Sequence, residues 1–278
     1  MASITDCVVE GLKYPFNDIK KLLGVGILFV IIDLLSIVFT IKTVDVTKMI
    51  IGILEKTNAT AFNLNFSQLP NGDIYLAIAI LVVGFIVSLI ILGYLYDVVK
   101  FSINRKDDLP EFGDIVGMFI RGVKYFLVSL AYSIPSMIVT FLAILVTNNS
   151  SAWPVIMIIS VLVMIICYFF MIMALNNMIA HDSIKKAFDF SEIMGNISNL
   201  GWIKYIGIIL FTVIVFMIIN IAIGIVMSFL TVIFAATINN QAIVISTVIS
   251  VIEALFVTSY WSVFFSRVCG SIYRESVK

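Results

Sequence analysis

Six long apolar runs, separated by short polar segments, dominate this sequence. They cover residues 22–41, 74–96, 124–147, 154–180, 203–236 and 242–267. A hydrocarbon core about 30 Å thick needs about 20 apolar residues in a helix, and every run reaches that length. Each run is expected to be helical, because lipid offers no hydrogen-bond partner to an open backbone. The sequence therefore predicts an all-α integral membrane protein with six transmembrane helices, forming one domain over residues 1–278.

The composition excludes an ordinary soluble fold. Hydrophobic residues make up 62% of the 278 residues and charged residues only 12%, against about 45–50% and 25% in soluble domains. No soluble core of this size buries so much apolar surface, so the expected solvent is lipid. The formal net charge is zero, which gives no reason to expect a nucleic-acid partner. The expected partners are membrane lipids, and a homo-oligomer or another membrane protein stays open.

The basic residues are distributed unevenly between the two sides of the predicted membrane domain. With six spans, all 17 Lys and Arg residues except Lys42, Lys48 and Lys56 fall on the side that holds both termini. Cytoplasmic loops carry an excess of Lys and Arg over loops on the opposite side. We therefore expect a multi-pass protein of the plasma membrane whose N-terminus and C-terminus are both cytoplasmic.

The six spans group into three helical hairpins, at about residues 1–100, 101–182 and 183–278. Each hairpin begins with a stretch that would be amphipathic as a helix. Such a helix lies in the headgroup layer with its apolar face toward the acyl chains. The repeated layout indicates a triplicated hairpin, in which an interfacial helix precedes each pair of spans.

The start and stop signals of the three amphipathic stretches differ. Over residues 4–12 an apolar residue recurs every four positions, which places these side chains on one helical face. In the second unit Asp114 is placed to cap a helix, and in the third Ser183 is placed to cap one. Gly195 is expected to end this third helix.

The fifth run is longer than a bilayer requires. Residues 203–236 would form a straight helix on the order of 50 Å long, so it must tilt strongly, project into water or break. Asn220 with Gly224 marks the expected break. Two half-spans there, giving an odd number of crossings, remain an alternative, and the sequence does not decide between one long and one broken helix.

Several short motifs together carry a resemblance to a known family. They are Tyr14-Pro15-Phe16, Gly93-Tyr94, Leu109-Pro110-Glu111-Phe112 with Gly122 after it, and Ile134-Pro135. With this set, strongest over residues 14–135, the chain resembles an uncharacterised membrane-protein family, a domain of unknown function known mainly from methanogenic archaea. The resemblance implies a helical membrane fold and an archaeal plasma membrane. It implies no activity and no functional residues.

Four polar residues are expected near the middle of the bilayer. Asp33 lies near the centre of the first span, Asn220 in the fifth, and Ser250 and Glu253 in the sixth. A charged side chain at the bilayer centre costs at least about 2.5–3.5 kcal/mol, so such residues usually have a role. One interpretation is an ion or proton site in a permeation path. The others are interhelical hydrogen bonds and contacts with lipid or a partner.

Small residues recur at every fourth position of the sixth span. The ladder consists of Ser246, Ser250, Ala254, Thr258, Ser262 and Ser266. Such a pattern lets a second helix approach closely. Because four residues overshoot a 3.6-residue turn, the ladder winds around the helix and favours a crossed partner. We expect it to serve helix packing, within the chain or against another subunit, with pore lining as the alternative.

The expected function is that of a channel or transporter for a small ion or solute that uses the midplane polar residues. Transporter folds are often built from internal repeats with a site near the bilayer midplane. The alternative is a non-catalytic membrane-organising or lipid-associated scaffold, or an accessory subunit of a membrane complex. The sequence contains no P-loop, zinc-ligand spacing, nucleophile elbow or dinucleotide fingerprint. No enzymatic activity, cofactor or metal site is therefore expected.

Overall fold

A computed structural model describes residues 4–57, 71–146, 153–237 and 242–278, and every regular element in these ranges is helical. The long elements are α2 (Ile19–Thr57), α3 (Asn71–Ile103), α4 (Ile115–Val146), α5 (Trp153–His181) and α7 (Trp202–Thr237). The last span consists of α8 (Ala242–Ile252), η5 (Glu253–Thr258) and α9 (Ser259–Ser276). The short elements are α1 (Ile4–Lys13), η1 (Tyr14–Asn17), η4 (Ile184–Phe188) and α6 (Phe190–Leu200).

Six helices in the described part of the chain are long and apolar enough to cross a membrane. They correspond to the six predicted runs, so the predicted all-helical fold with six long apolar helices is confirmed. Within the most apolar window of each helix, between 11% and 22% of the residues are buried inside the protein. Most of the apolar side chains on these helices therefore face outward, as a lipid solvent requires.

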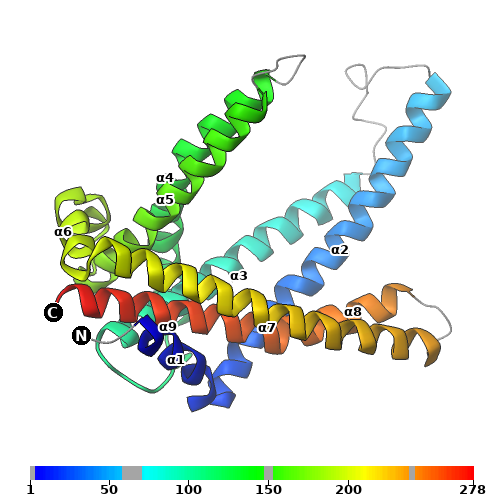
Figure 1. Cartoon of the computed structure of the whole chain (residues 1–278). Coiled ribbons are helices and arrows are strands. Elements are labelled where there is room, and N and C mark those ends of the chain that lie inside the picture. The colour runs from blue at the N-terminus through cyan, green and yellow to red at the C-terminus, as the bar shows by residue number, and fades with distance from the viewer. Residues whose placement is uncertain (1–3, 58–70, 147–152, 238–241) are drawn as a thin grey trace.

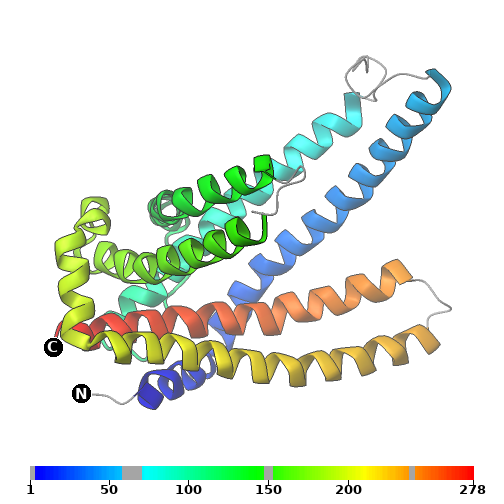
Figure 2. The ribbon, with the colours of Figure 1, turned by 45° about the horizontal axis from the view of Figure 1, so that its top comes forward.

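The long helices form three hairpins that diverge from one end of the molecule (Figures 1 and 2). The pairs are α2 with α3, α4 with α5, and α7 with the helix made of α8, η5 and α9. Both ends of the chain lie at the end where the hairpins meet, together with α1 and α6 (Figure 1). We call this the shared end.

The buried core is concentrated at the shared end. Its larger cluster joins α1, α3, α4, α5, α6, α7 and α9, and its smaller cluster joins α2, α3, α4 and α9. Toward the opposite end the hairpins separate from one another (Figure 2). The fold therefore fixes the hairpins relative to one another near the termini, where side chains from all three hairpins are in contact.

The first amphipathic stretch forms a helix as predicted, and this helix packs against the hairpins. In α1, Cys7 and Val8 are almost completely buried. Gly11 faces α9, where a Cβ atom would meet Val268. The Tyr14-Pro15-Phe16 motif then forms η1, a turn of 3₁₀ helix between α1 and α2, as expected where proline disfavours continuation of the preceding helix.

The second predicted interfacial helix does not exist as a separate element. Asp114 does cap a helix, since its Oδ1 accepts a hydrogen bond of 2.8 Å from the Gly117 N–H group. The capped helix is α4 itself, which continues without interruption to Val146 and includes Pro135. The prediction was wrong because no helix-ending residue separates the polar start of α4 from its apolar part.

The boundaries predicted for the third amphipathic helix were also wrong. Ser183 makes no side-chain cap, and residues 184–188 form the 3₁₀ turn η4. The helix that follows is α6, whose cap is Asp189, which accepts from the Glu192 N–H group at 3.2 Å. Gly195 lies inside α6, which ends at Gly201 with φ of 91°. A positive φ of this size favours glycine, so Gly201 and not Gly195 terminates the helix.

The sequence left open whether the fifth run forms one long or one broken helix, and the structure has one long helix without the break considered at Asn220 and Gly224. Helix α7 is continuous over 36 residues. The Asn220 Nδ2 group donates to the Phe216 backbone oxygen of the same helix at 2.8 Å, so this polar side chain is satisfied without opening the backbone. The irregular segment lies instead in the sixth span, where η5 is a π-helix of six residues. Single π-helical turns occur often at functional sites.

Candidate functional site

One groove between α2 and α8 contains Asp33 together with several hydroxyl groups. Asp33, Ser36 and Thr40 line it from α2, and Ser246, Thr247 and Ser250 line it from α8. The groove has a volume of about 320 Å³. Positions 33, 36 and 40 on α2 and 246 and 250 on α8 follow the spacing of three and four residues that gathers side chains on one helical face.

Four of the five hydroxyl groups that line this groove donate hydrogen bonds to backbone oxygens of their own helices. Thr40 donates to the Ser36 oxygen at 2.8 Å, and Thr247 donates to the Ile243 oxygen at 2.8 Å. Ser250 likewise donates to the Thr247 oxygen at 3.0 Å. A hydroxyl has one donor and two acceptor lone pairs. With the donors used in the helices, what these side chains offer to the groove is mainly acceptor oxygen.

Asp33 is the acidic member of the groove. Its Oδ2 atom is buried and has no hydrogen-bond partner among the described residues. An unpaired buried carboxylate oxygen is costly, since burying a charge is tolerated only when it is paired or hydrogen-bonded. The groove therefore combines an unpartnered carboxylate with acceptor oxygens, an arrangement suited to a cation or a proton.

Asn220 and Glu253 line a different groove, between α7 and the sixth span. This groove has a volume of about 420 Å³ and also includes Gly224, Thr258 and Ser262. Glu253 begins the π-helix η5 and is exposed. The four polar residues predicted near the midplane therefore divide between two grooves, Asp33 and Ser250 in one and Asn220 and Glu253 in the other.

The position of α2 explains this division. Helix α2 packs directly against η5, and a Cβ atom on Gly26 would lie 2.3 Å from the Leu255 backbone oxygen. Asn220, in contrast, belongs to α7 and lines a groove together with Val257 and Trp261 of the sixth span. Ser250 and Glu253 are close in sequence, but they face different neighbouring helices.

The predicted small-residue ladder does not face a single helix. Ser246 and Ser250 line the groove with α2, and Ala254 is buried. Thr258 and Ser262 line the groove with α7. Ser262 and Ser266 also line a cavity against α5. The winding expected from a four-residue repeat accounts for this distribution. The sixth span thus contacts several elements with one series of small residues.

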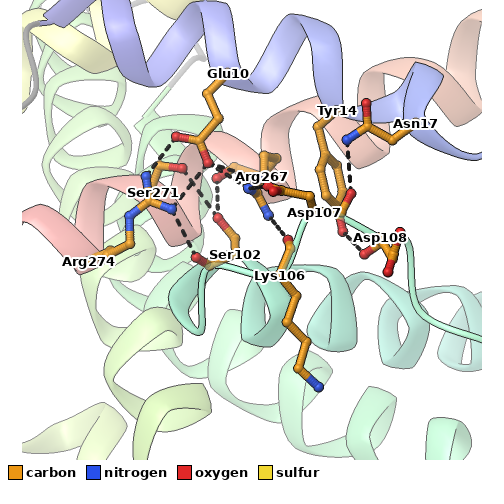
Figure 3. A network of polar contacts seen from close by, with 10 residues as sticks. All are labelled: Glu10, Tyr14, Asn17, Ser102, Lys106, Asp107, Asp108, Arg267, Ser271 and Arg274. Carbon is orange, nitrogen blue, oxygen red and sulfur yellow. Dashed lines mark hydrogen bonds and ion pairs between the residues drawn. The ribbon is translucent and has the colours of Figure 1, made fainter.

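A second polar constellation, not anticipated from the sequence, lies at the shared end around Arg267 (Figure 3). The Arg267 side chain is only 2% exposed, and its Nη2 atom lies 2.7 Å from Glu10 Oε1 and 3.1 Å from Asp107 Oδ1. Its guanidinium also lies 4.2 Å from the ring centroid of Tyr14. The group is thus enclosed by two carboxylates and an aromatic face.

Glu10 also binds a second arginine. Arg274 Nη2 lies 2.6 Å from Glu10 Oε2, and Arg274 also donates to the Ser102 backbone oxygen. Burial raises the pKa of Glu10, but the hydrogen bond from Arg274 and the charge of Arg267 outweigh burial, and the pKa lies below the usual value. Glu10 is therefore held as a carboxylate between two cations, linking α1 to α9.

The segment between α3 and α4 completes this constellation. The Tyr14 hydroxyl donates to the Asp108 backbone oxygen at 2.7 Å, and Asn17 Nδ2 donates to the Asp107 backbone oxygen at 2.9 Å. Burial raises the pKa of Tyr14 to about 12, so this hydroxyl keeps its proton and remains a donor. Figure 3 shows that the network joins α1, η1, the α3–α4 segment and α9.

Sequence reasoning missed this network because its members are far apart in the chain. Arg267 and Glu10 are separated by 257 positions, and no local periodicity connects them. The signal that existed was an arginine two positions after the aromatic pair Phe264 and Phe265, at the end of an apolar run. Within the described residues, no group of three or more His, Cys, Asp or Glu side chains is arranged to hold a metal ion.

These features define a class of protein before any comparison. The chain has six helices that are long and apolar enough to cross a membrane, and most of their apolar surface faces outward. These properties define a polytopic α-helical membrane protein. The model of the family described as "Protein of unknown function (DUF4013)" matches residues 75–232, which is more than half of the chain. The chain belongs to this family.

The family agrees with the resemblance in part. Its function is unknown, as the resemblance implied, and the match covers the motifs at residues 93–94, 109–112 and 134–135. The Tyr14-Pro15-Phe16 motif lies outside the matched residues, and an archaeal origin stays a prediction. The comparisons with curated proteins and with solved structures gave no match.

Proposed function

We propose that this protein is a channel or transporter for a small cation or for protons, and that Asp33 is its binding residue. The observation that carries the proposal is the groove between α2 and α8, which contains the unpartnered Asp33 Oδ2 and five hydroxyls, four of which donate to their own helices. A cation or a proton neutralises the carboxylate and so relieves the cost of an ionised group in the bilayer.

The groove suits a cation better than an anion. Its polar side chains are a carboxylate and five hydroxyls, and hard cations prefer carboxylate, hydroxyl and carbonyl oxygens as ligands. An anion would find no positively charged side chain among the lining residues and would be repelled by Asp33. The α7 groove with Glu253 is a second polar surface on the sixth span, and we assign it no part in the binding step.

The proposed orientation places the shared end in the cytoplasm of a plasma membrane. All Lys and Arg residues except Lys42, Lys48 and Lys56 lie on the sequence segments that carry the termini or lead toward them, and cytoplasmic segments are enriched in these residues. We propose no enzymatic activity, no cofactor and no nucleic-acid partner. The expected partners are lipids, with a second copy of the chain as a further candidate.

Flux through the purified protein in sealed liposomes tests the proposal. Proton and monovalent cation fluxes would be measured for the unchanged chain, for Asp33→Asn and for Glu253→Gln. We expect flux above that of empty liposomes, reduced at least about tenfold by Asp33→Asn, since losing one favourable charge interaction of 1.4 kcal/mol changes an equilibrium tenfold. Glu253→Gln is the matched control, because it removes a carboxylate from the other groove.

The outcomes separate the two functions that the sequence left open. Flux that Asp33→Asn leaves unchanged contradicts the proposed site. Absence of proton and cation flux under imposed gradients favours the alternative, a membrane-organising or lipid-associated scaffold. The large outward-facing apolar surface of the hairpins favours that alternative, and changes in vesicle shape or size on reconstitution would then be expected.

A further inference from the structure

A cavity lies where the three hairpins meet, and it shares no lining residue with the Asp33 groove. Helices α3, α4, α5 and α9 each contribute lining residues, and the volume is about 200 Å³. The volume of the cavity is several times the roughly 30 Å³ that one water molecule occupies in the liquid. The cavity is thus large enough for the head of a small molecule, at a position fixed by all three hairpins.

The polar group that defines this cavity is Asn176. The residue is only 1% exposed, and its Nδ2 group uses both hydrogens, donating to the Ile172 oxygen at 2.9 Å and to the Cys269 oxygen at 3.0 Å. Its Oδ1 atom is buried without a partner among the described residues. A buried unsatisfied acceptor costs free energy comparable to a lost hydrogen bond, so Asn176 Oδ1 calls for a donor from a ligand.

Two phenol groups line the same cavity and call for an acceptor. Tyr125 of α4 and Tyr168 of α5 both belong to the lining, and the structure gives neither hydroxyl a hydrogen-bond partner among the residues it describes. Tyr125 is partly buried and Tyr168 is 50% exposed, but a hydroxyl that faces a largely apolar cavity without a partner still lacks a hydrogen bond. A ligand that donates to Asn176 and accepts from a tyrosine needs both capacities, and an alcohol hydroxyl has both.

The remaining lining restricts the ligand further. Every described residue around the cavity is uncharged, and most of the lining is apolar, so an ionised ligand would lack a counter-charge. Tyr168 lines the cavity and is 50% exposed, so we take its side of α5 as the entrance to the cavity, facing the lipid. A ligand that enters beside Tyr168 comes from the bilayer, and its apolar chains stay in the bilayer.

We propose that this cavity binds a neutral lipid through a free hydroxyl group, which donates to Asn176 Oδ1 and accepts from Tyr125 or Tyr168. The hydroxyl-bearing head occupies the cavity, and the acyl chains pass Tyr168 into the membrane. The site contacts all three hairpins at once. It is independent of the Asp33 groove, and its test does not depend on transport.

Binding of radiolabelled 1,2-dioctanoylglycerol, which has one free hydroxyl, tests the site on the purified full-length chain in detergent. We expect saturable binding, weakened roughly tenfold by Tyr125→Phe combined with Tyr168→Phe, because one to two net hydrogen bonds are lost. Tyr75→Phe is the matched control, since Tyr75 is 69% exposed elsewhere on α3. Trioctanoylglycerol, which lacks the hydroxyl, is expected not to compete.

A cavity-filling variant provides a separate test. Ser266 lines the cavity and donates only to the Ser262 oxygen of its own helix, so Ser266→Leu fills the space without breaking a contact between helices. With an unchanged thermal unfolding midpoint, this variant should abolish binding. The proposal is overturned if binding is not saturable, which leaves the cavity to water, or if trioctanoylglycerol competes equally. Competition by free glycerol at equal affinity would also overturn it, because the ligand would then be a soluble polyol.

Discussion

Arg267 illustrates at the residue scale how a charge becomes tolerable inside the last apolar run. Taking an ion out of water costs several kcal/mol, and an ion pair repays this only with good geometry and further hydrogen bonds. Arg267 has these, from Glu10, from Asp107 and from the Lys106 backbone oxygen. In such pairs the free-energy cost of desolvation and the gain from the ion pair nearly cancel. The main consequence of the network is therefore that it fixes α1 and the α3–α4 segment against α9.

A first prediction concerns Glu10. Replacing it in Glu10→Gln leaves Arg267 and Arg274 without their shared carboxylate, and we expect destabilisation by about 2 kcal/mol at pH 7, since hydrogen bonds to charged groups contribute about 1.5–3 kcal/mol. The pKa of Glu10 is lowered in the folded protein, so its contribution is complete above the usual glutamate value and is lost as the pH falls through the lowered pKa. The difference between variant and unchanged chain should therefore shrink below about pH 4.

Thermal unfolding of the detergent-solubilised protein between pH 3 and 8 measures this difference. Glu111→Gln is the matched control, because Glu111 is an exposed residue of the α3–α4 segment and no ion pair connects it to the described residues. A Glu10→Gln difference that persists unchanged at pH 3 would contradict the proposed electrostatic role.

At the scale of elements, the closest approach between helices was not where the sequence pointed. The ladder of the sixth span was expected to admit a partner, and its residues face several neighbours. Between α3 and α4, two glycines permit the approach: a Cβ atom on Gly93 would lie 1.8 Å from the Met118 oxygen, and one on Gly122 would lie 1.8 Å from the Leu89 oxygen. Both glycines belong to the motifs that carry the family resemblance, and close helix packing is the physical reason for glycine there.

The second prediction follows from this contact. Gly122→Ala forces a methyl group into a backbone carbonyl, so α3 and α4 must separate, and we expect destabilisation by about 1–3 kcal/mol as in other overpacked sites. Gly84→Ala on α3 is the control, since a Cβ there meets no atom within 4 Å, and alanine favours a helix over glycine by about 1 kcal/mol. Thermal unfolding in detergent measures both, and equal midpoints for the two variants would refute the explanation.

At the scale of the whole molecule, the hairpins are fixed relative to one another mainly near the termini. The ion-pair network around Arg267, the buried cores and the proposed lipid cavity all lie toward the shared end. At the opposite end, an ion pair of 3.1 Å between Lys42 and Asp73 joins α2 to α3 within one hairpin. The half of each hairpin away from the shared end therefore depends on surrounding lipid for its packing. The contacts that fix the hairpins relative to one another lie at the shared end.

A third prediction concerns orientation. In a background with the three cysteines replaced by alanine, Lys48→Cys and Lys185→Cys each introduce one exposed thiol. A membrane-impermeant maleimide should label Lys48→Cys in intact cells, and Lys185→Cys only after lysis, because cytoplasmic segments hold most of the basic residues. The reverse pattern would place the shared end outside the cell.

The local predictions succeeded where they depended on neighbouring residues. The spans and the cap at Asp114 follow from hydropathy and from hydrogen bonding over a few positions. Whether the fifth run breaks at Asn220 was left open by the sequence, and the structure has a continuous helix in which the Asn220 amide binds the Phe216 oxygen. The predicted end of the third amphipathic helix at Gly195 was wrong, because the sequence does not show that Gly201 is the glycine with a positive φ.

The sequence by itself determined that this chain forms six helices long and apolar enough to cross a membrane, because this depends on the amounts and order of apolar residues. It also predicts an orientation, from the distribution of the basic residues. Tertiary structure alone decided which polar residues meet. Asp33 and Glu253, which the sequence predicts at similar depth, line different grooves, whereas Glu10 and Arg267 are brought together across 257 positions. Contacts between helices depend on their rotation and crossing, and hydropathy carries no information about either.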